Sequence, residues 1–154
     1  MESGIDAFIR AVEKQAAIAI EQNTGTNAFI LKIADDYAFI RLSDLHTPLK
    51  FLKQLAGAPP IQFGTQGFRP DIVDDKNPAR HYIAFVFVGY WLPFVFGWLV
   101  LWGWEILGYF RYRFQWSPND IRCGMVGLRH GRMVRKEGVQ VLADYIRRDL
   151  KSTS

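Results

Sequence analysis

Residues 82–104 run for 23 positions without a charged side chain, and this run constrains the fold more than any other part of the chain. As one α-helix it would be roughly 35 Å long, at about 1.5 Å per residue, and would cross a hydrocarbon core of about 30 Å. Pro93 lies near its middle, with Gly89 and Gly97 four residues to either side. Proline inside a helix kinks or breaks it. The run is therefore either one long apolar helix or an apolar helical hairpin broken near Pro93.

Aromatic residues cluster in and just after this run. All five tryptophans of the chain fall within residues 91–116. Tryptophan and tyrosine prefer the boundary between membrane and water, where an apolar ring and a polar N–H or O–H are both accommodated. The clustering therefore favours contact between this part of the chain and lipid.

The net charge of +4 hides an asymmetry along the chain. Residues 1–81 carry −1, residues 82–105 carry −1 and residues 106–154 carry +6. Basic residues close to a membrane segment attract anionic headgroups by about 1 kcal/mol each, and they favour the cytoplasmic side. We therefore predict a cytoplasmic C-terminus and membrane lipids as partners. The residues predicted to contact headgroups are Arg111, Arg113, Arg132, Arg135 and Lys136.

Nucleic acid is the competing partner for a basic surface. The basic region lacks a recognition-helix pattern, an RNP motif and zinc-ligand spacing. Because these are the fingerprints of the common nucleic-acid-binding modules, we do not predict nucleic-acid binding.

The N-terminal part of the chain predicts helices and one short β element. Apolar residues at spacings of three and four predict a helix over residues 4–22. Two β-branched and aromatic runs, 28–33 and 37–42, flank an acidic turn and predict a β-hairpin. A short helix should follow within residues 47–57, between a Thr-Pro start and a glycine stop. Residues 58–77 are rich in proline, glycine and acids, which predicts an irregular connector.

The C-terminal part predicts helices only. An Asn-Pro pair begins the apolar helical segment 78–110, and a Ser-Pro pair begins the basic C-terminal helices within 117–151. Gly127 and Gly131 form a GxxxG spacing that lets a second helix approach closely, so this helix is a candidate for a protein partner or self-association. We predict one mainly α domain over residues 1–154.

Several kinds of chemistry find no support in the sequence. Cys123 is the only cysteine, which excludes an intrachain disulfide and a site of several thiolates. His46, His81 and His130 are far apart in sequence, and no nucleotide-binding or catalytic motif is present. The N-terminus lacks the sustained apolar core of a secretory signal peptide. We therefore predict no metal site and no cofactor.

Two ionisable residues bracket the uncharged run, His81 at its start and Glu105 at its end. On one continuous helix they would be roughly 36 Å apart and could not share a site. If the chain reverses near Pro93, they arrive at the same end. They could then act as an acid–base pair, because burial raises the pKa of a carboxyl group. Asp120, Arg122 and His130 are candidates to join such a cluster.

These features support two functions of different class. The preferred interpretation is a small membrane-associated protein anchored by residues 82–104, with an interaction or anchoring role. The alternative is a soluble, cytoplasmic helical hydrolase or effector-like domain in which a buried hairpin brings the catalytic residues His81 and Glu105 together. A third possibility is an apolar hairpin that inserts into membranes only on demand. Whether the protein is an enzyme is left open.

Overall fold

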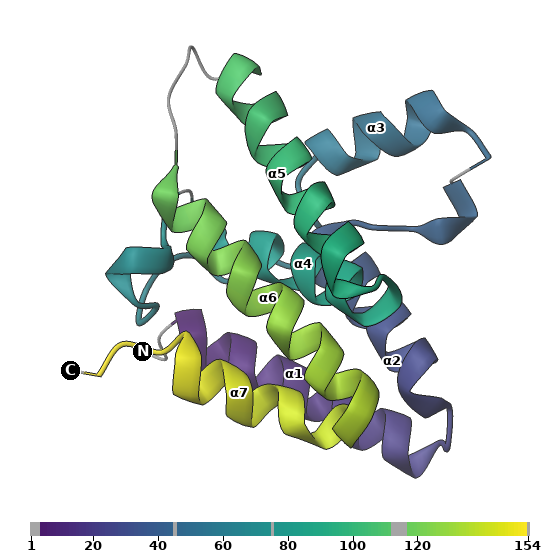
Figure 1. Ribbon diagram of the computed structural model, residues 1–154. Helices are drawn as coiled ribbons and strands as arrows, with labels where there is room; N and C mark the ends of the chain where they lie inside the picture. Colours follow the sequence, from purple (N-terminus) through teal and green to yellow (C-terminus); the bar gives the residue numbers. More distant parts are fainter. Residues whose placement is uncertain (1–3, 45, 75, 112–116, 154) are drawn as a thin grey trace.

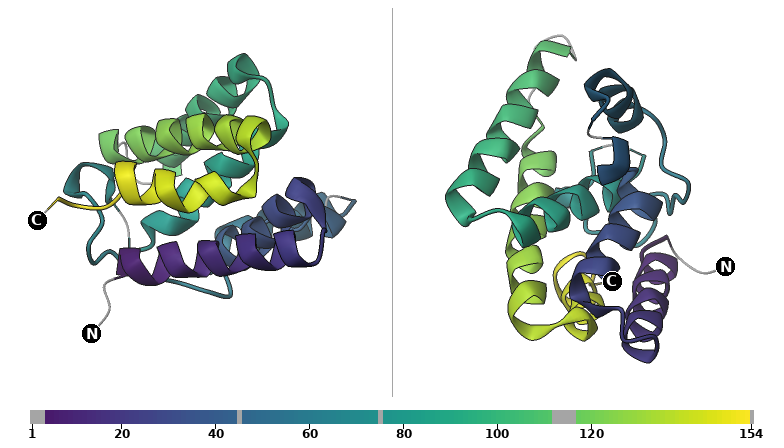
Figure 2. Two further views of the ribbon diagram at one scale, coloured as in Figure 1. Left: turned by 90° about the horizontal axis from the view of Figure 1, so that it is seen from below. Right: turned by 90° about the vertical axis from the view of Figure 1, so that its right-hand side faces the viewer.

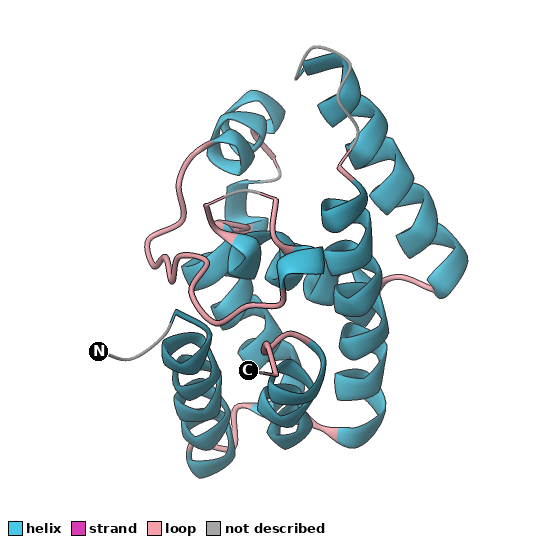
Figure 3. Cartoon of the chain, turned by 90° about the vertical axis from the view of Figure 1, so that its left-hand side faces the viewer, coloured by secondary structure: helices cyan, strands magenta, loops and turns pink. Residues whose placement is uncertain are grey.

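The computed structural model describes residues 4–44, 46–74, 76–111 and 117–153. They form seven α-helices (Figure 1), and this part of the chain contains helices and loops but no β-strand (Figure 3). The predicted mainly α class is confirmed. The helices are α1 (Gly4–Glu21), α2 (Gly25–Ile33), α3 (Pro48–Ala56), α4 (Pro78–Trp91), α5 (Phe94–Arg111), α6 (Pro118–Glu137) and α7 (Leu142–Asp149).

The predicted β-hairpin over 28–33 and 37–42 is wrong. The first run belongs to α2, and Ala34–Ala38 continue it as one π-helical turn that ends at Phe39 in the left-handed conformation. The reason is the spacing of the buried side chains. Phe29, Ile33 and Tyr37 recur at every fourth residue and all lie in the core, which is the period of a helix face. A strand would have placed alternate residues, not every fourth one, on the buried side.

The apolar run does not form one continuous helix. Helix α4 ends at Trp91, Leu92 is extended (φ −104°, ψ 145°), and α5 begins after Pro93. Proline disfavours the helical conformation of the preceding residue and removes a backbone donor, which explains the break. The long apolar helix is thus wrong and the break near Pro93 is confirmed. No described helix combines the length and hydropathy that a membrane-spanning helix requires.

Helix α6 lies at the centre of the fold and packs most extensively on α4. Three glycines, Gly89 of α4 with Gly127 and Gly131 of α6, leave room for backbone contact at the crossing. A Cβ added at Gly127 would lie 2.7 Å from the carbonyl oxygen of Tyr82, so no larger residue fits without separating the helices. The GxxxG spacing therefore serves a contact within the chain. Self-association through this helix stays a prediction.

Both ends of the described chain are held by the connector between α3 and α4. The N–H of Ile5 donates to the carbonyl of Gln66 (2.9 Å), and the N–H of Arg69 donates to that of Leu150 (2.8 Å). Helices α1 and α7 pack against each other, as Figure 2 shows. The described residues among 58–77 are irregular apart from one 3-10 turn, Pro70–Ile72, and an isolated β-bridge between Phe68 and Lys151.

Aromatic rings fill the core between α1, α4 and the connector. The ring of Phe8 is the centre of this cluster and lies 5.0–6.2 Å, centroid to centroid, from the rings of Tyr37, Phe63, Phe68 and Tyr82. Phe8, Tyr37, Phe68 and Tyr82 are buried. This core fixes α4, and through the glycine crossing it also fixes α6.

Candidate functional site

Three ionisable side chains converge where α4, α5 and α6 meet. They are His81 in the first turn of α4, Glu105 in α5 and Asp120 in the first turn of α6. The Nε2 atom of His81 lies 3.9 Å from Oε1 of Glu105 and 2.9 Å from the main-chain carbonyl oxygen of Asp120. One potential ligand atom from each of the three side chains lies within 4.8 Å of the other two. We call these three residues the His81 cluster.

Local packing directs His81 into this cluster. Its ring lies 4.9 Å from the ring of Phe85, one turn further along α4. Gly124 of α6 faces them, and a Cβ there would lie 3.4 Å from Nε2 of His81 and 2.5 Å from the Leu101 side chain. A larger residue at 124 would therefore have to displace the Leu101 side chain between α5 and α6. The glycine allows the two helices to bring Glu105 and Asp120 to the same point.

The Glu105 carboxyl group is almost completely covered, with 7% of the residue exposed. Burial and the charges of Asp120 and Asp74 together raise its pKa from 4.5 to about 7. Burial is the main cause, because a charged carboxylate loses its hydration when protein covers it. The group is thus poised between its two protonation states near neutral pH.

The predicted meeting of His81 and Glu105 is confirmed, and it depends on the break at Pro93. Their use in catalysis stays a prediction. Asp120 joins them, as its candidacy for the cluster anticipated. The N-cap of α6 is Ser117, whose Oγ accepts the N–H of Asp120 at 3.1 Å.

The other two candidates lie elsewhere. Arg122 lines a surface cleft near Asp71. His130 is completely buried between α4 and α7, where its Nδ1 accepts the Tyr82 hydroxyl (2.8 Å) and its Nε2–H donates to Asp149 (2.8 Å). Sequence reasoning gave no sign of this second cluster, because its members are 19 and 48 residues apart.

Helix α5 exposes an apolar surface along most of its length. It packs mainly on α6, with a smaller contact to α4, and lies at the edge of the molecule in Figures 1 and 2. The buried positions, Gly97, Leu101 and Glu105, recur at every fourth residue and face the protein. The exposed positions are all apolar or glycine: Phe94, Val95, Phe96, Trp98, Leu99, Val100, Gly103, Trp104, Ile106, Leu107 and Phe110. We call these exposed positions the α5 face.

The polarity of α5 is the reverse of that of an ordinary surface helix. A surface helix turns apolar residues inward and charged residues towards water. Here Glu105, the only charged residue of α5 before Arg111, is turned inward, while large apolar side chains point out. Exposed apolar patches of more than a few hundred Å² are rare on soluble monomers and mark interaction sites.

Basic residues of α6 lie at the start of the α5 face. The guanidinium carbon of Arg132 lies 5.2 Å from the ring centre of Phe94, and Arg135 donates to the carbonyl oxygen of Tyr90 (3.2 Å). Lys136, the residue after Arg135 in α6, is exposed. Arg111 is the last residue of α5. Arg113 lies outside the described residues. Four of the five predicted headgroup contacts thus lie on the two helices that carry or border the α5 face.

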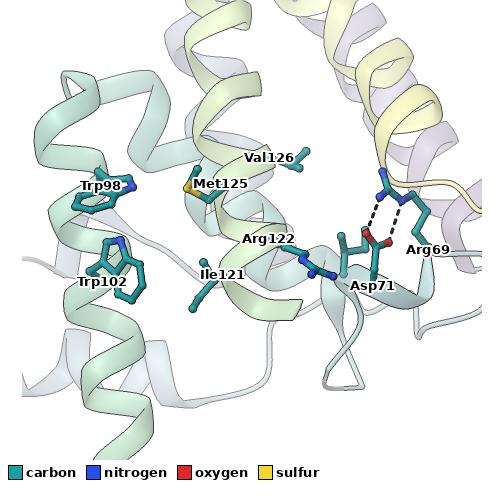
Figure 4. Close-up of a pocket in the computed structure, with 9 residues that line it drawn as sticks. Arg69, Asp71, Trp98, Trp102, Ile121, Arg122, Met125 and Val126 are labelled. Atoms are coloured by element: carbon teal, nitrogen blue, oxygen red, sulfur yellow. Dashed lines mark hydrogen bonds and ion pairs between the residues drawn. The ribbon is translucent and has the colours of Figure 1, made fainter. Parts of the chain in front are cut away.

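An open cleft of about 500 Å³ crosses the first half of α6 (Figure 4). Trp98 and Trp102 of α5 form one side, and Ile121 and Met125 point towards them from α6. The ion pair of Arg69 with Asp71 (2.6 Å) bounds the opposite side of the cleft. Dashed lines mark this ion pair in Figure 4. The apolar side of the cleft is continuous with the α5 face through Trp98.

No family model, no curated protein and no solved structure matches this chain.

Proposed function

We propose that this chain is a membrane-associated protein with an interaction or anchoring role, and that α5 is its membrane-contacting element. The observation that carries the proposal is the reversed polarity of α5, with its one internal charge turned inward and its apolar side chains turned outward. Membrane proteins adopt this arrangement, because lipid tails favour apolar surface while polar groups are kept against protein.

The energetic incentive for covering the α5 face is large. Covering a Leu, Val or Phe side chain completely is worth roughly 1.5–3 kcal/mol. The large side chains of the α5 face are between 42% and 67% exposed, so each contributes roughly 1 kcal/mol when covered. A bilayer can collect most of these contributions at once. A small ligand cannot, because the exposed positions are distributed along the whole helix.

The aromatic and basic residues on and beside the α5 face favour lipid over a protein partner. Trp91, Trp98 and Trp104 are partly exposed, and tryptophan prefers the depth of lipid headgroups. Arg132 and Arg135 lie at the Phe94 end of the face, where a guanidinium group can reach headgroup phosphates. This combination of apolar, aromatic and basic residues is typical of helices that lie in the membrane interface.

The proposed mode is insertion into one leaflet, with α5 along the membrane surface. Its 18 residues correspond to about 27 Å of helix, which is slightly less than the hydrocarbon thickness of about 30 Å. The inward-facing Glu105 remains covered by α6 in this arrangement. Because the C-terminal part of the chain carries an excess of +6, we propose the anionic cytoplasmic leaflet as the membrane surface.

Vesicle flotation tests the proposal. The purified protein is mixed with phosphatidylcholine vesicles that contain either no phosphatidylglycerol or a third of it. We expect co-flotation that is stronger with the anionic vesicles, together with a blue shift of tryptophan fluorescence. Leu99→Glu and Leu107→Glu should each weaken binding roughly tenfold, which corresponds to about 1.4 kcal/mol.

Leu49→Glu provides the matched control. Leu49 of α3 is 77% exposed, against 57% for Leu99 and 67% for Leu107, but it lies outside the α5 face. It should leave flotation unchanged. A wild-type protein that is a monodisperse monomer in plain buffer and does not bind either vesicle would refute the proposal. A concentration-dependent dimer abolished by Leu99→Glu, without vesicle binding, would instead assign the α5 face to a second copy of the chain.

A further inference from the structure

The His81 cluster contains a carboxylate that the protein covers without stabilising. Glu105 is 7% exposed, and no N–H or O–H of the described residues donates to its carboxylate. Its nearest ionisable neighbour is His81, at a distance of 3.9 Å that is too long for a hydrogen bond. A buried carboxylate without a donor is costly, so natural proteins pair such groups or let them coordinate a cation.

The surroundings of Glu105 add negative charge. A carboxylate oxygen of Asp120 lies within 4.8 Å of a carboxylate oxygen of Glu105, so a second acidic group faces the first. No arginine or lysine of the described residues forms an ion pair with Glu105. The site thus concentrates oxygen ligands around one imidazole.

The second histidine cluster of the same fold provides a contrast. His130 also lies beside a carboxylate, Asp149, but there the two groups are 2.8 Å apart and hydrogen-bonded. Asp149 additionally accepts hydrogen bonds from Arg129 (2.6 Å) and Arg148 (2.8 Å). That cluster is saturated by the protein itself. The His81 cluster has the same residue types, a longer separation and no such donors at Glu105.

From this geometry we infer that the His81 cluster is a binding site for one divalent transition-metal cation. The ligands are Nε2 of His81 and one carboxylate oxygen each from Glu105 and Asp120. The main-chain carbonyl oxygen of Asp120, 2.9 Å from Nε2, is a fourth candidate. Neighbouring ligands of an ion with bonds of about 2.1 Å are about 3.0 Å apart, and opposite ligands are about 4.2 Å apart. The three side-chain ligand atoms lie within 4.8 Å of one another, so binding requires them to move closer together.

The donor set selects the class of cation. Imidazole suits zinc, iron, nickel and copper, whereas carboxylate and carbonyl oxygens suit manganese, magnesium and calcium. One nitrogen combined with two or three oxygens therefore favours Mn²⁺ or Zn²⁺ over Ca²⁺ and Mg²⁺. Without the ion, Nε2–H of His81 donates to the Asp120 carbonyl oxygen at 2.9 Å. Binding therefore requires the His81 proton to lie on Nδ1 instead, so that the Nε2 lone pair faces the ion. The expectation of no metal site rested on sequence spacing, and here the fold brings the ligands together from three helices.

Calorimetric titration with MnCl₂ and with ZnCl₂ tests the inference on tag-free, full-length protein that has been treated with a chelator. We expect one ion per chain, with Ca²⁺ and Mg²⁺ binding at least tenfold more weakly. His81→Ala and Glu105→Gln should each weaken binding by about 100-fold or more, since loss of a group that only orients a ligand already costs about 10–100-fold. Circular dichroism of each variant verifies that it is folded.

The chain offers a matched control for each substitution. His46→Ala removes an exposed histidine, and Glu21→Gln removes an exposed glutamate of α1; neither should change the affinity. Electron paramagnetic resonance of bound Mn²⁺ gives an independent readout, because coordination by His81 Nε2 adds a nitrogen coupling that disappears in His81→Ala.

Two results would overturn the inference: no binding by the wild type, or equal losses in the His81 and His46 variants. The inference is independent of the membrane proposal. Leu99→Glu should weaken vesicle binding roughly tenfold and leave metal affinity unchanged, whereas Glu105→Gln should weaken metal binding and leave vesicle binding unchanged.

Discussion

His130 makes the stability of this protein depend on pH, and the structure gives the sign and the size of the effect. The ring is completely buried. Because the Asp149 carboxylate is only an acceptor, Nε2 carries the proton, and Nδ1 accepts the hydroxyl of Tyr82. Both hydrogen bonds are satisfied by the neutral ring. The other ionisable neighbours are Arg129, Arg148 and the Tyr145 ring stacked 5.1 Å away.

The pKa of His130 is lowered from 6.5 to about 4. Burial is the main cause, the two arginines act in the same direction, and Asp149 acts in the opposite direction. An unfolded chain titrates this group near 6.5, so between pH 6.5 and 4 the unfolded state binds more protons than the folded state. Stability is therefore complete above pH 6.5 and is lost as the pH falls towards 4. A difference of 2.5 pKa units corresponds to roughly 3 kcal/mol.

The assay is urea unfolding at half-unit steps from pH 8 to pH 4, for the wild type and for His130→Gln. Glutamine can still donate to Asp149 but does not titrate. The comparison is needed because Glu105 changes stability in the opposite direction. Its pKa is raised to about 7 in the folded state, so the folded state takes up this proton at a higher pH than the unfolded state does. Acidification therefore stabilises the folded state through Glu105. The difference between the two proteins cancels this contribution.

We expect the stability difference between wild type and His130→Gln to shrink by roughly 3 kcal/mol from pH 7 to pH 4. A difference that is constant with pH would refute the reasoning. If the variant does not fold, the pKa of His130 can be measured by nuclear magnetic resonance of the wild type. A value above 6 would refute it equally.

Three further predictions follow from the packing. Gly127→Ala should destabilise the protein by about 1–2 kcal/mol in urea unfolding, because the added Cβ would lie 2.7 Å from a backbone oxygen of α4. Gly103→Ala should instead stabilise α5 by up to about 1 kcal/mol, because the space around Gly103 is open. Cys123 is buried, so an aromatic disulfide reagent should modify it at the rate of unfolding; rapid modification would contradict the fold. Double electron–electron resonance should give a distance within about 20 Å between spin labels at Arg80 and Ile106. A continuous helix would place these positions about 39 Å apart.

Local signals in the sequence predicted most helix ends. The Thr47-Pro48 and Ser117-Pro118 pairs start helices α3 and α6 as expected, and Gly57 follows the end of α3. These signals work because they depend on the backbone of a few consecutive residues. The wrong prediction of a β-hairpin over 28–33 and 37–42 shows the limit of such local signals. Short runs of Phe, Ile and Tyr suit a strand and a buried helix equally well, and only the four-residue spacing of the buried positions distinguishes them.

The His81 cluster was half predictable. A proline near the middle of the run indicated where the chain could reverse, and the reversal required His81 and Glu105 to meet. Asp120 was harder to assign, because its arrival depends on how α6 packs against α4. That packing is set by Gly124, Gly127 and their neighbours, whose lack of a side chain has no meaning until the partner helix is known. Sequence spacing therefore predicted a pair, and tertiary packing made it a cluster of three.

Hydropathy predicted that residues 82–104 are covered by lipid or by the protein itself, but it could not distinguish between the two. Helix α4 is covered by the core, whereas α5 gives only the stripe of Gly97, Leu101 and Glu105 to the protein. A helix stabilised only by its own domain would expose its one charged residue to water and would turn its large apolar residues towards the protein. The observed distribution is the opposite one, and it supports the proposal that the outer side of α5 faces an environment of low polarity. A lipid interface meets that condition, and it also allows the polar His81 cluster to lie on the inner side of the same helix.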